Sequence, residues 1–235
     1  MSPYTRFLQV ALPSTLIAVP VASVLMLADS VREHDGISAS IDPHIAADAL
    51  DVRTGVLTHV AQLLTLIGSE VVVGSLALML VIALLERRGP FLAGCAAAAM
   101  AVSAAMTVGV KLAVERARPG EANRLGPVDS SYSFPSGHTL NSAVLLGLVV
   151  ILLVPLIAAR RKRIAAVLGA GLLALGIGLS RIYLGYHWAS DVAASWLIAT
   201  ALLTLVCVVI RVRRRRFEGR QRSGGSQVRA PSVTS

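Results

Sequence analysis

The chain has 235 residues, of which 55% are hydrophobic and only 15% are charged, with a mean hydropathy of +0.71. Soluble domains carry about 25% charged residues, so this composition excludes an ordinary soluble domain. The net charge is +9 and the isoelectric point is near 10.7. Such a basic balance is typical of nucleic-acid-binding proteins, but the distribution of the arginines explains it without nucleic acid as a partner.

Six apolar runs are each close to the length of about 20 residues that a helix needs to cross the hydrocarbon core of a bilayer. They are Val10–Leu27, Val60–Leu85, Phe91–Leu112, Leu140–Ala159, Ile164–Leu184 and Val192–Ile210. In lipid the backbone must satisfy its own hydrogen bonds, and these runs lack the polar–apolar alternation of outer-membrane strands. The sequence therefore predicts an all-α, polytopic membrane protein with six transmembrane helices over residues 1–211.

The first two runs each leave an alternative. Val10–Leu27 could be a cleaved signal peptide, but its 18 residues exceed the 7–15 of a signal h-region, which favours a retained helix. Glu70 interrupts the second run, and a carboxylate inside a membrane span is often functional. We interpret Glu70 instead as an interfacial side chain or as part of a helix end at Gly68-Ser69. It is not included in the candidate site.

Basic residues cluster after the second, fourth and sixth runs, as Arg87 and Arg88, Arg160–Arg163 and Arg211–Arg216. Alternate connections lie on one side of the membrane, and the positive-inside rule makes that side cytoplasmic, together with both termini. Residues 212–235 turn from Arg-rich to Ser/Gly-rich and are predicted to be a disordered cytoplasmic tail. Two lysines against 20 arginines indicate a GC-rich bacterial gene, and hence a bacterial inner membrane.

Other charged and titratable residues gather at the opposite ends of the third to sixth runs. They are Lys111, Arg118, Ser136, Gly137, His138, Arg181, His187 and Asp191. Each of these residue types alone is common at a helix end or a membrane interface. Four helix ends that are distant in sequence nevertheless place them at one depth, so the topology itself predicts an active site at the extracytoplasmic ends of helices three to six.

The spacings of these residues suit chemistry on an anion. Lys111 and Arg118 are seven residues apart, so two helical turns bring them to one face. Ser136 is a natural N-cap, and Gly137 lets the backbone of a helix N-terminus approach an anion. His187 and Asp191 are four apart on a helix, so the carboxylate can hold one ring nitrogen and leave the other free as a nucleophile.

Three sequence blocks carry a resemblance to a known family. Lys111–Pro119 reads K-x6-R-P, Pro135–His138 reads P-S-G-H, and Ser180–Asp191 reads S-R-x5-H-x3-D. In this order they resemble the signature of the type 2 phosphatidic acid phosphatase superfamily, with a match at every signature position. The six-helix layout extends the resemblance to about Ile210. It implies an integral membrane phosphatase for a lipid phosphate monoester or diphosphate, such as undecaprenyl diphosphate, phosphatidylglycerophosphate or phosphatidic acid.

The resemblance also implies a role for each matching residue. His187 would attack phosphorus and form a phosphohistidine, with Asp191 orienting its ring, and His138 would protonate the leaving oxygen and then activate water. The phosphoryl oxygens would be held by Lys111, Arg118, Ser136, Gly137 and Arg181. No metal or other cofactor is expected, because three fixed cations can stabilise the charge of a transferring phosphoryl group and no carboxylate cluster for Mg²⁺ accompanies them.

Three other functions fit part of the pattern. A haloperoxidase of the same superfamily would share the three blocks, but it is expected to be soluble and larger, which the six apolar runs oppose. A phosphotransferase would differ only in its acceptor, so that alternative stays open. A transporter would carry polar groups near the bilayer midplane in broken helices, whereas the midplane here is apolar. The oligomeric state is open from the sequence.

Overall fold

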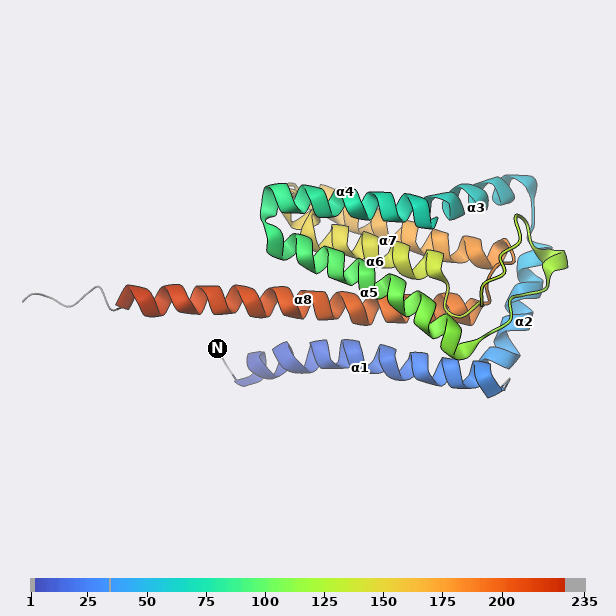
Figure 1. Ribbon diagram of the computed structural model, residues 1–235, viewed down its shortest axis with the longest axis horizontal. Helices are drawn as coiled ribbons and strands as arrows, with labels where there is room; N and C mark the ends of the chain where they lie inside the picture. The colour runs from blue at the N-terminus through green and yellow to red at the C-terminus, as the bar shows by residue number, and fades with distance from the viewer. Residues whose placement is uncertain (1–2, 34, 227–235) are drawn as a thin grey trace, which may run out of the picture.

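The computed structural model describes residues 3–33 and 35–226, and within these ranges it contains helices and connections but no strand. The α-helices are α1 (Pro3–Glu33), α2 (Gly36–Asp51), α3 (Gly55–Ile67), α4 (Glu70–Arg88), α5 (Pro90–Val114), α6 (Gly137–Leu152), α7 (Arg160–Tyr183) and α8 (Ala189–Ser226). Two short 3₁₀ helices, η1 (Glu121–Asn123) and η2 (Val154–Leu156), lie in connections. The all-α prediction is confirmed. Figure 1 shows the long helices side by side, with α2 lying across one end of the bundle.

Five helical segments are individually long and apolar enough to cross a membrane. They are Ala11–Glu33, Pro90–Val114, Gly137–Leu156, Arg160–Tyr183 and Ala189–Glu218. The pair α3 and α4 passes the same test only jointly, with a bend of 44° between the two helices. By length and composition the described chain therefore has five candidate spans, or up to six if the bent pair crosses as one, and the predicted second run corresponds to this pair.

The bend at Gly68-Ser69 has a local cause. Ser69 is the N-cap of α4, and its hydroxyl accepts a hydrogen bond from the Val72 N–H at 3.4 Å. A Cβ on Gly68 would meet Ile177 of α7 at 2.5 Å, so glycine lets the chain pass close to α7. Glu70 is the first residue of α4, where a carboxylate is favoured by the positive end of the helix dipole. Glu70 thus lies at a helix end.

Two other boundaries differ from the apolar runs. Helix α6 ends at Leu152, before the predicted Ala159, because Pro155 has no N–H to donate and a 3₁₀ turn follows. Helix α8 continues to Ser226, so residues 212–226 of the predicted disordered tail are helical. Arginine is a good helix former, and the Arg214–Glu218 pair supports this extension at 3.0 Å. Residues 227–235 lie outside the described part.

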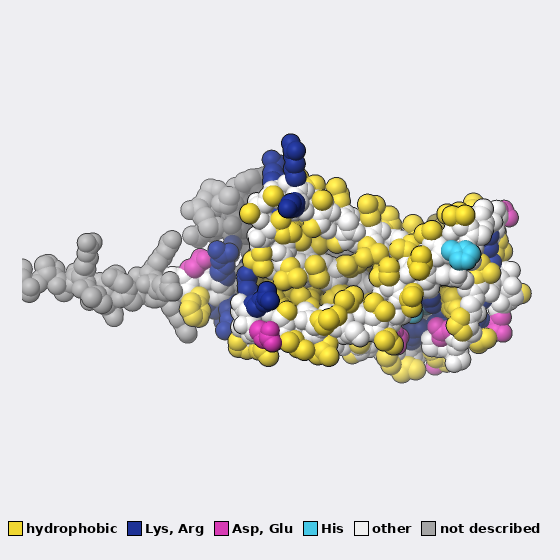
Figure 2. All heavy atoms as spheres, turned by 90° about the horizontal axis from the view of Figure 1, so that it is seen from above, with side chains coloured by type: hydrophobic (Ala, Val, Ile, Leu, Met, Phe, Trp, Pro, Cys, Tyr) yellow, Lys and Arg dark blue, Asp and Glu magenta, His cyan; other side chains and the backbone are white. Residues whose placement is uncertain are grey.

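Helix α6 lies at the centre of the bundle and packs against α4, α5, α7 and α8. Its Leu140 and Leu148 are fully buried. The facing side of α5 offers small buried residues, Ala96 and Ala99, and small residues let membrane helices approach closely. Many large apolar side chains face outward instead, as the apolar flank in Figure 2 shows. A bundle with this outer surface is suited to lipid rather than to water.

The two ends of the bundle differ in charge. Lys and Arg side chains gather at one end of the bundle (Figure 2). The arginines there lie in the last turn of α4, in the first turn of α7 and in the later part of α8. The first turn of α1 lies toward the same end (Figure 1). The opposite end carries α2 and the connection between α5 and α6. This arrangement brings the basic clusters together, as the predicted topology requires.

The orientation in the membrane is predicted from this asymmetry and can be tested by labelling. In a background with Cys95 and Cys207 replaced by alanine, Asn123→Cys should react with an impermeant maleimide in intact cells. Arg161→Cys, at the basic end, should react only after the cells are permeabilised. Both positions are exposed. Arg161 is chosen for the basic end in place of Gly89, because a side chain at Gly89 would be strained by the φ of +88°. The reverse labelling pattern would overturn the orientation.

Candidate active site

The connection between α5 and α6 folds over the turn between α7 and α8. The Leu125 N–H donates to the Leu184 carbonyl at 2.9 Å, and the Tyr186 hydroxyl donates to the Pro127 carbonyl at 3.0 Å. Gly185 has a φ of +76°, and a Cβ there would meet the Asn123 carbonyl oxygen at 2.6 Å. A glycine is therefore needed where the two segments touch. This contact brings the ends of α5, α6, α7 and α8 together.

Asp191 lies in the first turn of α8, and His187 lies in the turn just before this helix rather than on it as the spacing predicted. Both are buried, with 0% and 3% exposure. His187 Nδ1 lies 3.3 Å from Asp191 Oδ2, as the i,i+4 spacing predicts. The same carboxylate oxygen accepts hydrogen bonds from the Trp188 N–H at 3.0 Å and from the Ser133 hydroxyl. The backbone N–H of His187 also donates to the Arg181 carbonyl at 3.2 Å. His187 is thus held in place by its backbone N–H and by the contacts of its ring Nδ1.

The contacts of the two ring nitrogens define the His187 tautomer. Arg118 Nη1 lies 3.3 Å from His187 Nε2, and a guanidinium can only donate. Nε2 must therefore be the acceptor, and Nδ1 carries the proton and donates to Asp191. This assignment follows from the hydrogen-bond network. The lone pair of Nε2 consequently points to the side of the ring where the cationic Arg118 lies.

The protonation of His187 is set mainly by burial. Burial lowers its pKa from 6.5 to about 4, against the hydrogen bond and the charge of Asp191, which raise it; Arg181 and Arg118 lower it further. The ring is therefore neutral at neutral pH. A neutral imidazole whose Nε2 is unprotonated is the form that can attack an electrophile, once the electrophile takes the place of the Arg118 N–H at this lone pair.

Arg118 and Lys111 are bound to the connection that precedes α6. Arg118 donates to the Ser131 carbonyl at 2.8 Å and to the Tyr186 carbonyl at 2.7 Å. Lys111 donates to the Ser131 hydroxyl at 3.0 Å and to the Tyr132 carbonyl. Burial lowers the pKa of Arg118 below its ordinary value. The structure thus brings both predicted cations together around Ser131.

Arg181 is 4% exposed and extends from the last turn of α7. Its Nη1 donates to the Thr65 hydroxyl of α3 at 2.6 Å, and its guanidinium lies 3.9 Å from the centre of the Tyr186 ring. Its Nε is buried and has no hydrogen-bond partner. A buried, unsatisfied donor on a cation is costly, so this N–H is suited to an anion that is bound between these residues.

The N-terminus of α6 supplies the remaining predicted residues. Ser136 is its N-cap and is fully buried, and its hydroxyl oxygen accepts bonds from the Thr139 N–H at 3.5 Å and the Thr139 hydroxyl at 2.9 Å. A Cβ on Gly137 would meet Thr107 of α5 at 3.0 Å, so glycine allows close packing there. Within the described chain, the His138 ring has no hydrogen-bond partner. The charges of Arg181, His187 and Arg118 act on it.

The structure adds residues that the sequence did not single out. Asp129 pairs with Arg118 at 2.6 Å, and Ser131 and Ser133 contact Arg118 and His187 respectively. Arg116 pairs with Asp191 and also with Asp42 of α2. Arg116 lies inside the first sequence block and Ser133 lies two residues before the second, so both could have been suspected from their positions. Asp42 could not, because its partner is 74 positions away.

Asp129 lies where an anionic substrate would have to compete for Arg118. Burial alone would raise its pKa, but hydrogen bonds from Ser131 and the Arg118 charge outweigh that effect and hold the pKa below its ordinary value. Asp129 is therefore a carboxylate at neutral pH. In this structure the Asp129 carboxylate is paired with Nη2 of Arg118.

Among the residues the structure describes, no group of three or more His, Cys, Asp or Glu residues could hold a metal ion.

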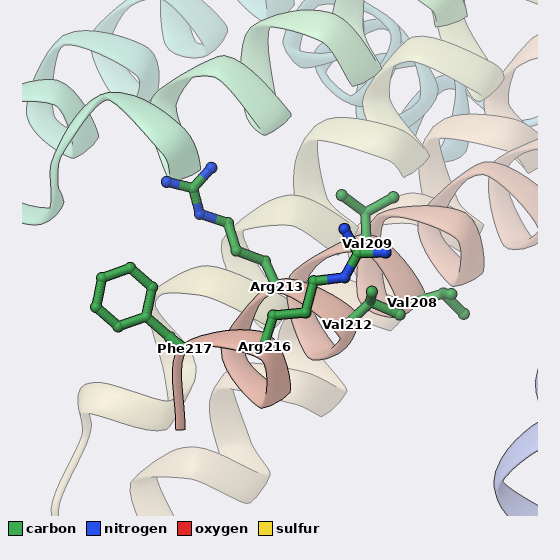
Figure 3. Close-up of a pocket in the computed structure, with 6 residues that line it drawn as sticks. All are labelled: Val208, Val209, Val212, Arg213, Arg216 and Phe217. Atoms are coloured by element: carbon green, nitrogen blue, oxygen red, sulfur yellow. The ribbon is translucent and has the colours of Figure 1, made fainter. Parts of the chain in front are cut away.

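A hollow of about 540 Å³ lies elsewhere, along the arginine-rich part of α8 (Figure 3). It is lined by Val208, Val209, Val212, Arg213, Arg216 and Phe217. Arg213 points away from α8 and lies 4.0 Å from the Phe91 ring of α5. This hollow is far along α8 from His187 and is not part of the candidate site.

The apolar helical bundle defines a multi-pass membrane protein, and a cluster of cations surrounds a buried His–Asp pair at one end of it. The sequence profile of the PAP2 superfamily matches residues 92–215, which is more than half of the chain. The chain belongs to the PAP2 superfamily. The resemblance found in the sequence is thereby confirmed.

Individual relatives agree with this membership. Phosphatidylglycerophosphatase B of Bacillus subtilis (strain 168) is 35% identical over 96 residues, which is 40% of this chain and 45% of that protein. The alignment therefore spans less than half of the relative's length. The crystal structure of the first transmembrane PAP2 type phosphatidylglycerolphosphate phosphatase from Bacillus subtilis superposes with a TM-score of 0.70 at 26% identity, over 82% of this chain and 96% of that chain.

A second solved structure shares the fold. Aquifex aeolicus LpxE superposes with a TM-score of 0.57 at 20% identity, over 72% of this chain and 95% of that chain. At this identity the similarity shows the helical arrangement alone. Both superpositions nevertheless cover nearly the whole length of the solved chains.

The Asp129–Arg118 pair predicts how strongly the site binds anions. Asp129→Asn should lower the inhibition constant of inorganic phosphate by roughly two- to fivefold, the range expected for loss of one partly exposed ion pair. Arg118 should stay in place, because the Ser131 and Tyr186 carbonyls still hold it. Glu121→Gln is the matched control, because it removes a charge from the same connection but pairs with Arg124. Equal or weaker inhibition in Asp129→Asn would contradict the competition.

Proposed function

We propose that this protein is an integral membrane phosphatase that hydrolyses a lipid phosphate monoester or diphosphate through a phosphohistidine on His187. The observation that carries this proposal is the state of His187. Its ring is neutral, its Nδ1 proton is directed to Asp191, and its Nε2 lone pair faces Arg118. A nucleophile directed at a cation suits an electrophile whose own oxygens are anionic, and a phosphoryl group is such an electrophile.

In the proposed first step, the Nε2 lone pair forms an N–P bond while the bond from phosphorus to the leaving oxygen breaks. His138 gives its proton to that oxygen, which departs as an alcohol or as a lipid phosphate. Asp191 stabilises the positive charge that develops on the His187 ring. In the second step, His138 takes a proton from water, the water oxygen bonds to phosphorus, and the N–P bond breaks to release inorganic phosphate.

The cations and the α6 N-terminus would bind the phosphoryl oxygens. Arg118 and Lys111 lie together, and Arg181 offers its unsatisfied Nε–H. Ser136 accepts both of its hydrogen bonds, so its own proton remains for donation, and the Gly137 N–H lies at the start of α6. Phosphoryl transfer depends mainly on such positioning and charge stabilisation. We therefore propose that hydrolysis needs no metal.

The position of the site in the membrane limits the class of possible substrates. The site lies at the end of an apolar bundle, so a substrate with an apolar tail in the bilayer can present its phosphate there. The similarity to Bacillus subtilis phosphatidylglycerophosphatase B, and to the Bacillus subtilis crystal structure described as a phosphatidylglycerolphosphate phosphatase, favours that lipid as the first candidate. With the basic clusters on the cytoplasmic side, the reaction would take place at the outer face of a bacterial inner membrane.

A lipid panel tests the function directly. Purified full-length protein in detergent should release inorganic phosphate from phosphatidylglycerophosphate, undecaprenyl diphosphate or phosphatidic acid, and fastest from the first. Release should persist in excess EDTA, because the stabilising charges are side chains. His187→Ala protein provides the background. Loss of activity in EDTA with recovery in Mg²⁺ would contradict the mechanism, and no release from any of these lipids would contradict the function.

Trapping of a labelled phosphoenzyme distinguishes the role of His187 from that of His138. His187→Ala should trap no label, because it lacks the nucleophile. His138→Ala should lose about 10²–10⁴-fold in rate, the usual contribution of a general acid or base. With an aryl phosphate whose phenol is acidic, its first step should be partly restored while the second stays slow. Labelled phosphohistidine should then accumulate.

Asp191→Asn serves as the intermediate variant, because the ring can stay in place while its positive charge loses a stabilising partner. It should form the phosphoenzyme more slowly than the wild-type protein but should still form it. If His187→Ala traps label, or if the two histidine variants exchange their behaviour, the assignment is wrong.

A further inference from the structure

Arg116 lies between two buried carboxylates that come from opposite parts of the sequence. Its Nη2 is 2.5 Å from Asp42 Oδ2 of α2, and its Nη1 is 2.5 Å from Asp191 Oδ1 of α8. The side chains of Arg116, Asp42 and Asp191 are 12%, 2% and 0% exposed. A guanidinium is planar and stays charged, so it can hold both carboxylates in a fixed geometry.

Asp42 is itself fixed to the start of α8. Its Oδ1 accepts a hydrogen bond from the Ser190 N–H at 2.9 Å, and its Oδ2 accepts one from the Ser190 hydroxyl at 2.5 Å. Ser190 lies in the first turn of α8, where a carboxylate satisfies unpaired N–H groups and is favoured by the helix dipole. The Arg116 guanidinium also lies 5.4 Å from the Trp188 ring centre. Helix α2 is thus joined to the N-terminus of α8, which follows His187 directly in the chain.

The two oxygens of Asp191 have separate tasks. Oδ2 contacts His187 Nδ1, and Oδ1 contacts Arg116. Rotation of this carboxylate would break both contacts, so the bond to Arg116 fixes the direction in which Asp191 holds the ring. Arg116 lies on the Nδ1 side of His187, whereas Arg118 lies on the Nε2 side. Arg116 is therefore placed to act on Asp191 and not on a bound phosphate.

We propose that Asp42 and Arg116 are positioning residues of the catalytic site, which act through Asp191 to hold the His187 ring in line for attack. This proposal rests on the phosphohistidine mechanism above. It extends the site to α2, because Asp42 lies outside residues 92–215 that match the superfamily profile. The cluster holds two carboxylates and one guanidinium, and its remaining negative charge faces the ring that becomes positive during attack.

The charges around His187 determine what the variants should do to its protonation. The groups that face it are Asp191 in the first turn of α8, Arg118 and Arg181 from the neighbouring segments, and His138 of α6. Arg116 partly neutralises Asp191, and Asp42 partly neutralises Arg116. Loss of the Arg116 charge should therefore raise the pKa of His187 from about 4 toward 6.5, and loss of the Asp42 charge should lower it.

The test uses the full-length protein with phosphatidylglycerophosphate and measures kcat, KM and the acid limb of the kcat/KM profile. Arg116→Ala, Arg116→Lys, Asp42→Ala and Asp42→Asn should lower kcat by about 10- to 100-fold, as loss of supporting groups commonly does. KM should change less than about twofold, because Lys111, Arg118 and Arg181 are untouched. Asp42→Asn should retain more activity than Asp42→Ala, because its amide oxygen can still accept from the Ser190 N–H.

The acid limb distinguishes positioning from a structural role. It should move to higher pH in Arg116→Ala and to lower pH in Asp42→Asn. The matched control is Arg53→Ala, which removes another bridging arginine at this end of the bundle. Arg53 donates to the Tyr183 carbonyl at 2.8 Å and the Asn123 carbonyl at 2.7 Å and contacts neither Asp191 nor His187. Its loss should lower the thermal unfolding temperature and leave the acid limb in place.

The outcomes separate the two proposals. If wild-type protein forms no phosphohistidine, the proposed function fails. If it does, but the Asp42 and Arg116 variants keep the wild-type kcat and acid limb, or raise KM at constant kcat, the positioning role is wrong. If Arg116→Ala does not fold, the positioning role is tested by the kcat and KM of Arg116→Lys and Asp42→Asn, which nearly keep the volume of the side chain.

Discussion

The buried carboxylate of Asp191 is the interaction on which the end of the bundle depends. It is fully buried and contacts His187, Trp188, Ser133 and Arg116 at once. An ionised carboxylate in an apolar interior is costly unless it is paired and hydrogen-bonded. Its partners come from the turn before α8 and from the connection before α6. Satisfying this one charge therefore requires both segments to be in place, and the cations proposed to bind phosphate lie on or beside them.

The apolar bundle provides the rigid frame for this polar cluster. Helix α6 is packed on four sides, so its N-terminus, with Ser136 and Gly137, has a fixed position against Thr107 of α5. Arg181 is held from outside the cluster by Thr65 of α3. The bend at Gly68-Ser69 separates α3 from α4 and lets α3 pack on α7. A kink in the second span thus contributes to the placement of a cation.

Much of this arrangement follows from the sequence because membrane topology is a strong constraint. Once the apolar runs are helices, the polar residues at alternate ends must share one face, and the i,i+4 spacing of His187 and Asp191 predicts their contact. A helix end at Gly68-Ser69 was one interpretation of Glu70, but nothing in the apolar run indicated that α3 and α4 meet there at an angle of 44°. The role of Asp42 was hidden, because nothing local indicates that the segment around this residue will fold back onto Arg116.

The tie between α2 and α8 bears on where the functional unit of this protein begins. The match to the superfamily profile begins at residue 92, yet the start of α8 is capped by a carboxylate from position 42. A chain cut down to the matched region would keep every signature residue. It would also leave the Ser190 N–H and one side of Arg116 without their acceptors. With the proposed roles of Asp42 and Arg116, the functional unit therefore extends beyond the segment that matches the profile.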